Sequence, residues 1–262
     1  MSIFSGSGLR VGVVGASESF AHLCAGAGLR SMYIGDEAVV ETAGFSLEGK
    51  KIKKVRQAVM RVERHGYTVE LRRHHELDTD TIAELERVSA CWRDGQPERG
   101  FSMALDHMHG DHLGDSWVVI ARDAEGVVRG FLHYVPTYGR PAASLSFMRR
   151  ERDTPNGVID FLVVRSIGLL RDEGIEELSL NFAAFARLLR EPGNLAERVL
   201  AWVVTLANPF FQIESLYRFN RKFHPRWEPR YLLYEGRFGL PRAGVAALLA
   251  EGQMPLVTPR AA

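Results

Sequence analysis

The order of short apolar strands and amphipathic helices between residues 67 and 234 constrains the fold most. Apolar residues that alternate or run continuously predict strands, and apolar residues three and four apart predict helices. The predicted strands are Tyr67–Arg73, Ser116–Arg122, Val127–Pro136, Ala143–Arg149, Glu177–Asn181 and Pro229–Tyr234, and the predicted helices are Thr79–Arg93, Gly157–Asp172, Leu195–Ala207 and Ile213–Phe223. Strands and helices in this order predict an α/β (α+β) protein with a mixed central sheet flanked by helices.

The order β-α-βββ-α-β-α-β is also that of GNAT-type acyltransferase domains. The residues before it look like part of a second, related unit, which makes the predicted fold a tandem GNAT-like one. That unit is predicted to contain strands Val11–Val14, Ser31–Ile34 and Glu37–Thr42, helix Ser19–Ala27, and a basic helix Leu47–His65 capped by Ser46. We therefore expect a partial N-terminal unit (1–65), a catalytic domain (66–250) and a tail (251–262).

Composition is that of a soluble globular protein, because 46% of the 262 residues are hydrophobic and 25% are charged. No run approaches the roughly 18 to 20 apolar residues that span a bilayer, so we expect any membrane contact to be peripheral. Cys24 and Cys91 lie far apart without a CxxC spacing, which favours neither a disulfide framework nor a thiolate zinc site. A reducing cytosol is the expected compartment.

Positive charge is concentrated rather than spread over the chain, whose net charge is only +1. Between Lys50 and Arg73 there are nine Lys and Arg residues against two acidic ones. Such a surface suits a phosphate backbone or an anionic membrane, although a plain solvated helix face remains the alternative. The predicted tRNA or membrane patch consists of Lys50, Lys51, Lys53, Lys54 and Arg56.

Two motifs suggest a metal or a nucleotide cofactor, and neither is well supported. Residues 107–112 spell HxHxDH, the metal-binding signature of metallo-β-lactamase-like hydrolases. That fold needs further ligands downstream, where only His133 and His224 remain, and a hairpin follows the motif where a helix is required. The run GVVGAS lacks the GxGxxG pattern of dinucleotide loops. We therefore predict no metal and no cofactor.

The stretch Arg149–Gly157 excludes the usual acyl donor of GNAT enzymes. Acetyl-CoA is held by an Arg/Gln-x-x-Gly-x-Gly/Ala loop at a helix start, and RRERDTPNG has no such loop. Arg149, Arg150 and Arg152 suit instead a phosphate that is recognised by charge. A donor other than acetyl-CoA is expected.

Several motifs resemble the C-terminal domain of the aminoacyl-phosphatidylglycerol synthases, the lysylphosphatidylglycerol synthetase and multiple peptide resistance factor family, in its actinobacterial branch. They are FSLEGKKIKKVRQAVMRVER (45–64), GFSMA (100–104), DTPNGVIDFL (153–162), NFAAF (181–185) and QIESLYRFNRKFHPRWEPRY (212–231). The resemblance implies a tandem GNAT fold that moves an aminoacyl group from aminoacyl-tRNA to a hydroxyl of phosphatidylglycerol or a related lipid. It implies aminoacyl-tRNA and an anionic phospholipid as partners, at the cytoplasmic face of the cell membrane.

An aminoacyl ester is already activated, so the transfer needs orientation, a base and charge stabilisation. Asp160, in the first turns of a helix whose dipole favours a negative charge, and Glu214 are the candidates for base or orienter. A capping role for Asp160 is the alternative. The predicted catalytic residues are Asp160, Glu214 and Lys222, and the predicted substrate-binding residues are Arg149, Arg230, Tyr231 and Asn181.

The chain departs from the family in ways that keep other functions open. Many relatives carry Leu-Asp-Leu-Met-Arg where this chain has Leu145-Ser146-Phe147-Met148-Arg149, so an acidic role at residue 146 does not carry over. Relatives also commonly bear an N-terminal membrane domain, which leaves a stand-alone paralogue or an excised catalytic part as two interpretations. The alternatives are aminoacyl transfer to a soluble acceptor and, from another class, a non-catalytic tRNA- or membrane-binding module.

Overall fold

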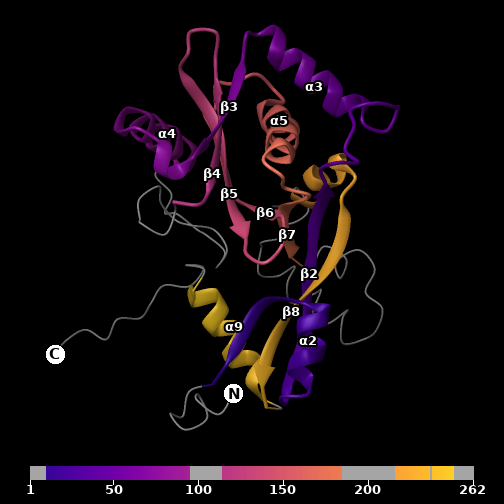
Figure 1. The fold of residues 1–262 in the computed structure, drawn as a ribbon. Coiled ribbons are helices and arrows are strands. Elements are labelled where there is room, and N and C mark those ends of the chain that lie inside the picture. Colours follow the sequence, from indigo (N-terminus) through magenta and orange to yellow (C-terminus); the bar gives the residue numbers. More distant parts are fainter. Residues whose placement is uncertain (1–9, 95–113, 185–215, 237, 251–262) are drawn as a thin grey trace, which may run out of the picture.

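All the strands that the structure describes lie in one eight-stranded sheet (Figure 1). The computed structural model describes residues 10–94, 114–184, 216–236 and 238–250. The strands are β1 (Gly12–Ser17), β2 (Leu29–Glu41), β3 (Thr68–Arg73), β4 (Trp117–Arg122), β5 (Val128–Thr137), β6 (Ala142–Arg150), β7 (Glu177–Ala184) and β8 (Arg226–Glu235). The helices are α2 (Glu18–Ala25), α3 (Lys53–Arg64), α4 (Thr79–Arg93), α5 (Val158–Asp172) and α9 (Gly239–Ala250), with short 3₁₀ turns η1 (His74–Glu76) and η3 (Arg221–Phe223).

The sheet consists of two antiparallel halves joined by one parallel pair. The strand order is β1-β8-β2-β7-β6-β5-β4-β3. One half, β3 to β6, is a meander of consecutive strands, and the other combines β1 and β2 with β7 and β8 from late in the chain. The parallel pair is β6–β7, whose connection is α5, as a parallel crossover requires.

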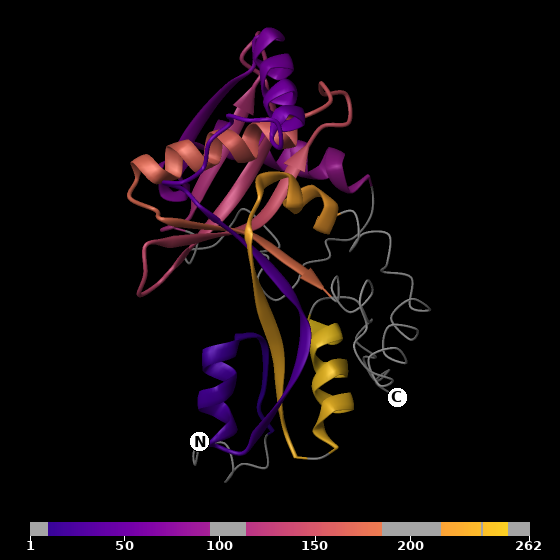
Figure 2. The ribbon, with the colours of Figure 1, turned by 90° about the vertical axis from the view of Figure 1, so that its right-hand side faces the viewer.

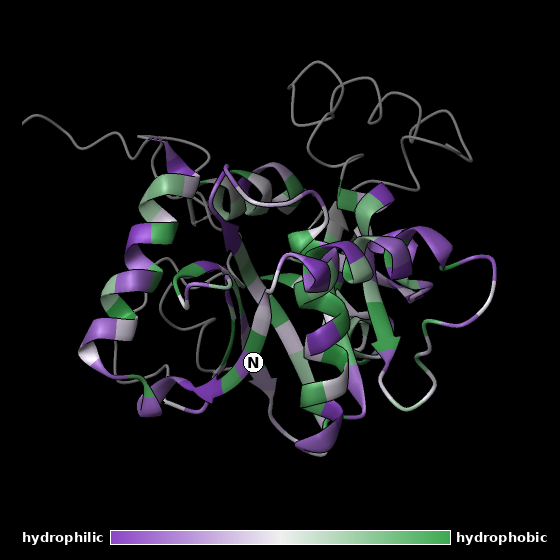
Figure 3. Cartoon of the chain, turned by 90° about the horizontal axis from the view of Figure 1, so that it is seen from above, coloured by the Kyte–Doolittle hydropathy of each residue, from purple (hydrophilic) through white to green (hydrophobic). Residues whose placement is uncertain are grey.

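Helices cover both faces of the sheet because successive strand residues point to opposite sides. In β4, Val119 and Ala121 belong to the large core that also contains the apolar stripe of α3 and the buried face of α5. Val118 and Ile120 of the same strand pack with Leu85 from α4 on the other face. In Figure 3 the helices alternate purple and green along their length, as expected for helices with one buried face.

The long strands β2 and β8 extend below the main body and carry a smaller layer. Figure 2 shows them running down together, with α2 and α9 on opposite sides of their lower part. Ala16, Ala21, Leu29 and Leu233 form a small separate core there, beneath α2.

The mixed α/β fold with a central sheet flanked by helices is confirmed, and several elements match closely. Helix α4 begins at Thr79 because the Asp78 side chain accepts a hydrogen bond from the Thr81 amide at 2.7 Å. The end of the predicted helix 213–223 is also helical, at residues 216–220 and in η3. The predicted helix 195–207 lies outside the described residues.

Two predictions about the first half were wrong, and one helix near the C-terminus was missed. The strands predicted at 31–34 and 37–42 are one strand, β2, because antiparallel neighbours on both sides carry it past Gly35 and Asp36. The basic helix begins at Lys53 rather than Leu47, since Gly49 adopts φ +87° and Ser46 accepts from the Glu48 amide in a turn instead of capping a helix. Helix α9 was not predicted.

The proposed division at residue 65 stays a prediction. In the sheet, β2 from the first 65 residues lies between β8 and β7 from the last hundred or so, so the sheet is continuous across that boundary. Among the residues that the structure describes, no helix is both long and apolar enough to span a bilayer.

Candidate active site

The sheet divides where the parallel strands β6 and β7 part. They pair only at Ala142–Glu177, Ala143–Leu178 and Ser144–Ser179. Beyond Ser144 each strand continues for several residues while held by its other neighbour, β5 or β2. The opening therefore lies at the carboxyl ends of two parallel strands, where α/β sheets commonly bind ligands.

A β-bulge in β6 begins beside this opening. The register with β5 passes from His133–Phe147 to Tyr134–Leu145, so β6 has one extra residue, Ser146. Ser146 is buried, with 4% of its surface exposed. The residue at the position where an acid was expected is thus the extra residue of this bulge, two positions beyond the last β6–β7 pair.

A second bulge, in β7, faces the first. The register with β2 passes from Val39–Ser179 to Glu37–Phe182, so Asn181 is accommodated as an extra residue. Its φ of +74° is left-handed, a conformation that asparagine tolerates better than most residues. The side-chain oxygen Oδ1 of Asn181 accepts from the Phe182 backbone amide at 2.7 Å, and the Asn181 backbone amide donates to Ser179 Oγ at 3.2 Å. Asn181 therefore fixes the bend in β7.

The start of α5 brings two predicted catalytic residues together. Lys222, in η3, donates to Asp160 Oδ1 at 2.8 Å, across 62 positions of sequence. The Asp160 side chain is 13% exposed, whereas that of Lys222 is 41% exposed and also lies over the Phe219 ring at 4.7 Å. Next to them, the buried Asn220 donates to the Leu180 carbonyl at 3.2 Å, which ties η3 to β7 just beyond the last β6–β7 pair. A carboxylate and a partly open ammonium thus lie close to the opening.

Arg149, in β6, is a further cation, but it lies with Phe147 on the α4 face of the sheet, opposite the face that carries Asp160. It pairs with Phe131 in the sheet, and its guanidinium lies 5.0 Å from the centre of the Phe147 ring. Burial lowers the pKa of Arg149 to about 10, and the positive charge of Arg93 contributes. Arg149 therefore remains protonated at neutral pH and provides a fixed, partly desolvated positive charge.

Arg230 lies between carboxylates on the opposite face from α5. It forms ion pairs with Glu37 and, at 3.0 Å, with Glu228. Burial raises the pKa of Glu228, but Arg226 and Arg230 outweigh this and hold that pKa below its usual range. The role of Arg230 in substrate binding stays a prediction, and here its charge is balanced by acidic side chains. The next residue, Tyr231, faces the other way and packs edge-on against Tyr33.

The patch Lys50–Arg56 lies at the start of α3. All four lysines are exposed, and none makes an ion pair within the part of the chain that the structure describes. Arg56 instead donates to the carbonyls of Leu47 and Gly49 and so holds the preceding turn. The lysines are therefore available to a polyanion, whereas Arg56 is a structural residue.

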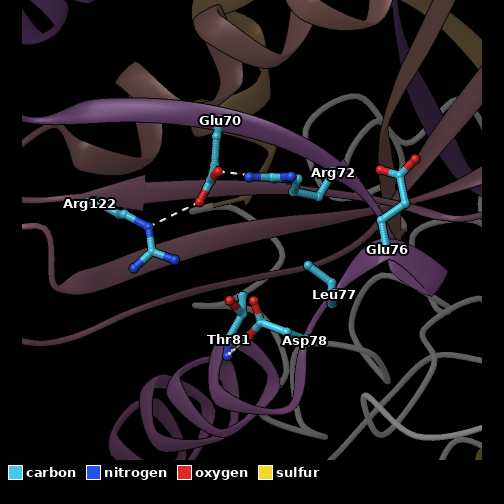
Figure 4. A pocket seen from close by; sticks show the side chains of 7 residues that line it. All are labelled: Glu70, Arg72, Glu76, Leu77, Asp78, Thr81 and Arg122. Atoms are coloured by element: carbon cyan, nitrogen blue, oxygen red, sulfur yellow. Dashed lines mark hydrogen bonds and ion pairs between the residues drawn. The ribbon is translucent and has the colours of Figure 1, made fainter.

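A charged hollow of about 280 Å³ lies at the far edge of the sheet and is an unsuitable candidate (Figure 4). Its side chains satisfy one another: Arg122 bridges Glu70 and Glu84, Arg72 pairs with Glu70, and Asp78 caps α4. Across the described ranges no group of His, Cys, Asp and Glu is arranged to hold a metal. Glu214 and the HxHxDH motif at 107–112 lie outside those ranges.

Comparison with known proteins identifies the family. A model of the C-terminal part of phosphatidylglycerol lysyltransferase matches residues 1–234. The chain belongs to this family. The lysylphosphatidylglycerol biosynthesis bifunctional protein LysX of Rhodococcus jostii is 40% identical over 255 residues, which cover 95% of this chain and 23% of that protein. LysX of Nocardia farcinica is 42% identical over 249 residues, covering 93% and 22%. The chain thus spans under a quarter of the length of these LysX relatives.

Solved structures agree with the family assignment. The C-terminal domain of a putative lysylphosphatidylglycerol synthetase from Agrobacterium fabrum has a TM-score of 0.75 at 29% identity, covering 95% of this chain and 76% of that one. L-PGS from Bacillus licheniformis has a TM-score of 0.76 at 24% identity, covering 94% and 74%, which shows the fold alone. FemX, at 0.54 and 8%, shares the fold at a greater distance. The resemblance inferred from the sequence motifs is confirmed.

Sequence reasoning missed two acidic residues beside the site of this lysyltransferase-family chain. Asp36 and Glu37 are both buried within β2, at 8% and 7% exposure. The sequence prediction placed Asp36 between two short strands and Glu37 at the start of the second one, positions where an acidic residue is ordinary. The sequence offered one indication of these two residues: an Asp-Glu pair is unusual inside a continuous strand.

Proposed function

We propose that the chain transfers an aminoacyl group from aminoacyl-tRNA to a hydroxyl of phosphatidylglycerol or a related anionic lipid. The observation that carries the proposal is the opening between β6 and β7, with its two facing bulges and the Asp160–Lys222 pair, in a member of the phosphatidylglycerol lysyltransferase family. The relatives named LysX are lysylphosphatidylglycerol biosynthesis proteins, which supports this choice of acceptor.

In the proposed reaction the lipid hydroxyl oxygen attacks the carbonyl carbon of the aminoacyl ester. The hydroxyl loses its proton, the bond from the carbonyl carbon to the ribose oxygen breaks, and the ribose oxygen takes up a proton. Lys222 is the group that we assign to this departing oxygen, because its ammonium is partly exposed and is held at 2.8 Å by Asp160. Asp160 is then a positioning residue, and Arg149 offers positive charge to a phosphate on the α4 face of β6.

The exposed lysines at the start of α3 are the proposed contact with the polyanionic partners. Four ammonium groups without ion pairs suit the phosphates of tRNA or an anionic lipid surface. Our proposal therefore includes that the enzyme acts at the inner face of the cell membrane, which its lysines contact from the outside of the bilayer.

The test is transfer of a radiolabelled aminoacyl group from lysyl-, alanyl- or arginyl-tRNA to phosphatidylglycerol vesicles. We expect an aminoacyl-lipid product, and a loss of about 100-fold or more in kcat for Lys222→Met because one charge-stabilising donor is removed. Lys222→Arg should retain more activity, and Asp160→Asn should lower kcat with little change in KM. The exposed Arg171→Met is the matched control and should be unaffected.

Two outcomes would overturn the proposal. No aminoacyl-lipid from any of the three charged tRNAs would exclude lipid transfer, and a product in the aqueous phase instead would identify a soluble acceptor. Full activity of Lys222→Met would remove Lys222 from the chemistry.

A further inference from the structure

Two adjacent carboxylates in β2 have opposite surroundings. Glu37 accepts from Ser179 Oγ at 2.5 Å and forms an ion pair with Arg230, so both its oxygens and its charge are satisfied. Asp36 is equally buried, yet its partner is the hydroxyl of Tyr33, which donates to Oδ2 at 2.5 Å. Among the residues that the structure describes, no cation forms an ion pair with Asp36.

A buried carboxylate that lacks a cation is costly to a folded protein. Acidic side chains are almost never fully buried unless they are paired, because the lost hydration must be replaced. A neutral hydroxyl replaces only part of it. Asp36 therefore suits a positive group that arrives from outside, through the small part of its surface that remains exposed.

Asp36 lies one strand away from the candidate active site and on its side of the sheet. It pairs with Ala183 in the section of β7 that has already parted from β6. Residues two and four further along β2, Ala38 and Val40, belong to the core beneath α5, so strand alternation directs Asp36 toward that face. Neighbouring strands are about 4.8 Å apart, which puts Asp36 within reach of a group bound in the opening.

Aromatic rings complete the surroundings of Asp36. Tyr33 and Tyr231 meet edge-on, with ring centres 6.2 Å apart, and both lie on the same side of β2 and β8 as Asp36. A carboxylate beside aromatic rings is a suitable environment for an ammonium group, which gains an ion pair and a cation–π contact together.

We propose that Asp36, oriented by Tyr33, binds the α-ammonium of the aminoacyl group. The inference rests on the proposed function, since every aminoacyl donor carries this ammonium on the carbon next to the reacting carbonyl. Binding there holds the ester in the opening in one orientation and selects donors whose α-nitrogen is free. Asp36 is a binding residue, and Tyr33 is a positioning residue that acts through it.

The test compares Asp36→Asn with wild type on two donors, an aminoacyl-tRNA that the wild type uses and the same tRNA acetylated on the α-nitrogen. Asn keeps an oxygen for the Tyr33 hydroxyl and removes the charge. Asp36→Asn should lower kcat/KM for the free-amine donor by about 10- to 100-fold, the range expected for a hydrogen bond to a charged group. It should barely change kcat/KM for the acetylated donor, which has already lost the interaction.

Controls separate this inference from the function itself. Tyr33→Phe should show the same pattern more weakly, and it replaces Asp36→Asn if thermal unfolding shows that the latter is destabilised. Asp172→Asn, at the exposed end of α5, should leave both donors unchanged. Equal losses on both donors, or a wild type that does not distinguish them, would overturn the role of Asp36 while transfer stands. Absence of any transfer by the wild type would instead contradict the proposed function.

If lysyl-tRNA is the donor, acetylation of the ε-nitrogen supplies a further arm. Asp36→Asn should still lose activity on that donor. If the loss of activity caused by Asp36→Asn disappears only with the ε-acetylated donor, Asp36 binds the lysine side chain, contrary to the proposal.

Discussion

At the scale of single residues, the buried imidazole of His133 shows how strongly this core resists charge. Its Nε2 lies 3.0 Å from Ser116 Oγ, and its ring stacks on Phe147 with centres 4.8 Å apart. Burial lowers the pKa of His133 to about 3, and proximity to His74 adds to the effect. The ring is therefore neutral in the folded protein at every pH near neutrality.

This depressed pKa predicts a loss of stability in mild acid. In the unfolded chain the histidine takes up a proton below about 6.5, whereas the folded chain does not until about 3. The contribution of His133 is thus fully present above pH 6.5 and declines as the pH falls, by about 1.4 kcal/mol per pH unit. Urea unfolding at pH 7, 6 and 5 should show this slope before the carboxylates titrate. The slope should vanish in His133→Leu and persist in the exposed His65→Gln; an unchanged slope in His133→Leu would contradict the assignment.

At the scale of elements, the contact between α3 and α5 holds the start of α5, and with it Asp160, in place. Gly157 precedes α5 with φ +106°, and a Cβ built there would lie 2.8 Å from the Cβ of Ala58 on α3. Arg61 donates to the Asn156 carbonyl at 3.1 Å, and Arg165 pairs with Glu63. Close approach of the two helices therefore depends on a residue without a side chain.

Replacing this glycine should destabilise the protein, whereas replacing another in the same helix should not. Gly157→Ala combines a left-handed backbone with a steric clash, and we expect a loss of about 1–3 kcal/mol in the free energy of unfolding. Gly168→Ala, inside α5 with no atom within 4 Å of the added Cβ, should gain about 0.5–1 kcal/mol. Urea denaturation measures both, and equal effects would show that the α3–α5 contact is not tight.

Local signals in the sequence correctly predicted the elements whose ends depend on nearby residues. They failed where pairing with a neighbouring strand determines the local structure. The Asp78 cap located α4 to the residue, and the chemistry of Asp160 and Lys222 identified two groups that do form a pair. The bulges at Ser146 and Asn181 are defined by register against β5 and β2, which periodicity along one strand does not contain. Asp36 was missed because its significance lies in the lack of a cation beside it among the described residues, which only the three-dimensional structure shows.

At the scale of the whole molecule, charge is distributed unevenly although the net charge is +1. Four of the five lysines lie between residues 50 and 54, at the start of α3 at the top of Figure 1. Many of the arginines that the structure describes instead form ion pairs, as Arg122, Arg129 and Arg226 do. Within the described residues, the start of α3 is thus a concentrated group of lysines without ion pairs, whereas many arginines elsewhere are paired with acidic side chains.

This asymmetry predicts a directional attraction to anionic surfaces. Neutralising Lys53 and Lys54 to Gln should weaken binding to phosphatidylglycerol-containing vesicles by about 30-fold at low salt, from roughly 1 kcal/mol per lysine near the surface. The exposed Arg30 and Arg171, changed together to Gln, remove the same charge elsewhere and should have a much smaller effect. Vesicle co-sedimentation at two salt concentrations measures both, and equal losses would show that net charge alone matters.

The position of β1 has a consequence for synthesis on the ribosome. Its neighbour in the sheet is β8, and Gly12 pairs with Tyr234. This partner is synthesised more than two hundred residues later. The β3–β6 meander, by contrast, is made of segments that are translated one after another. During translation the meander can form early, whereas β1 and β2 must remain without β8 until nearly the whole chain has emerged. The half of the sheet that carries Asp36 and Asn181 is therefore the last to be completed.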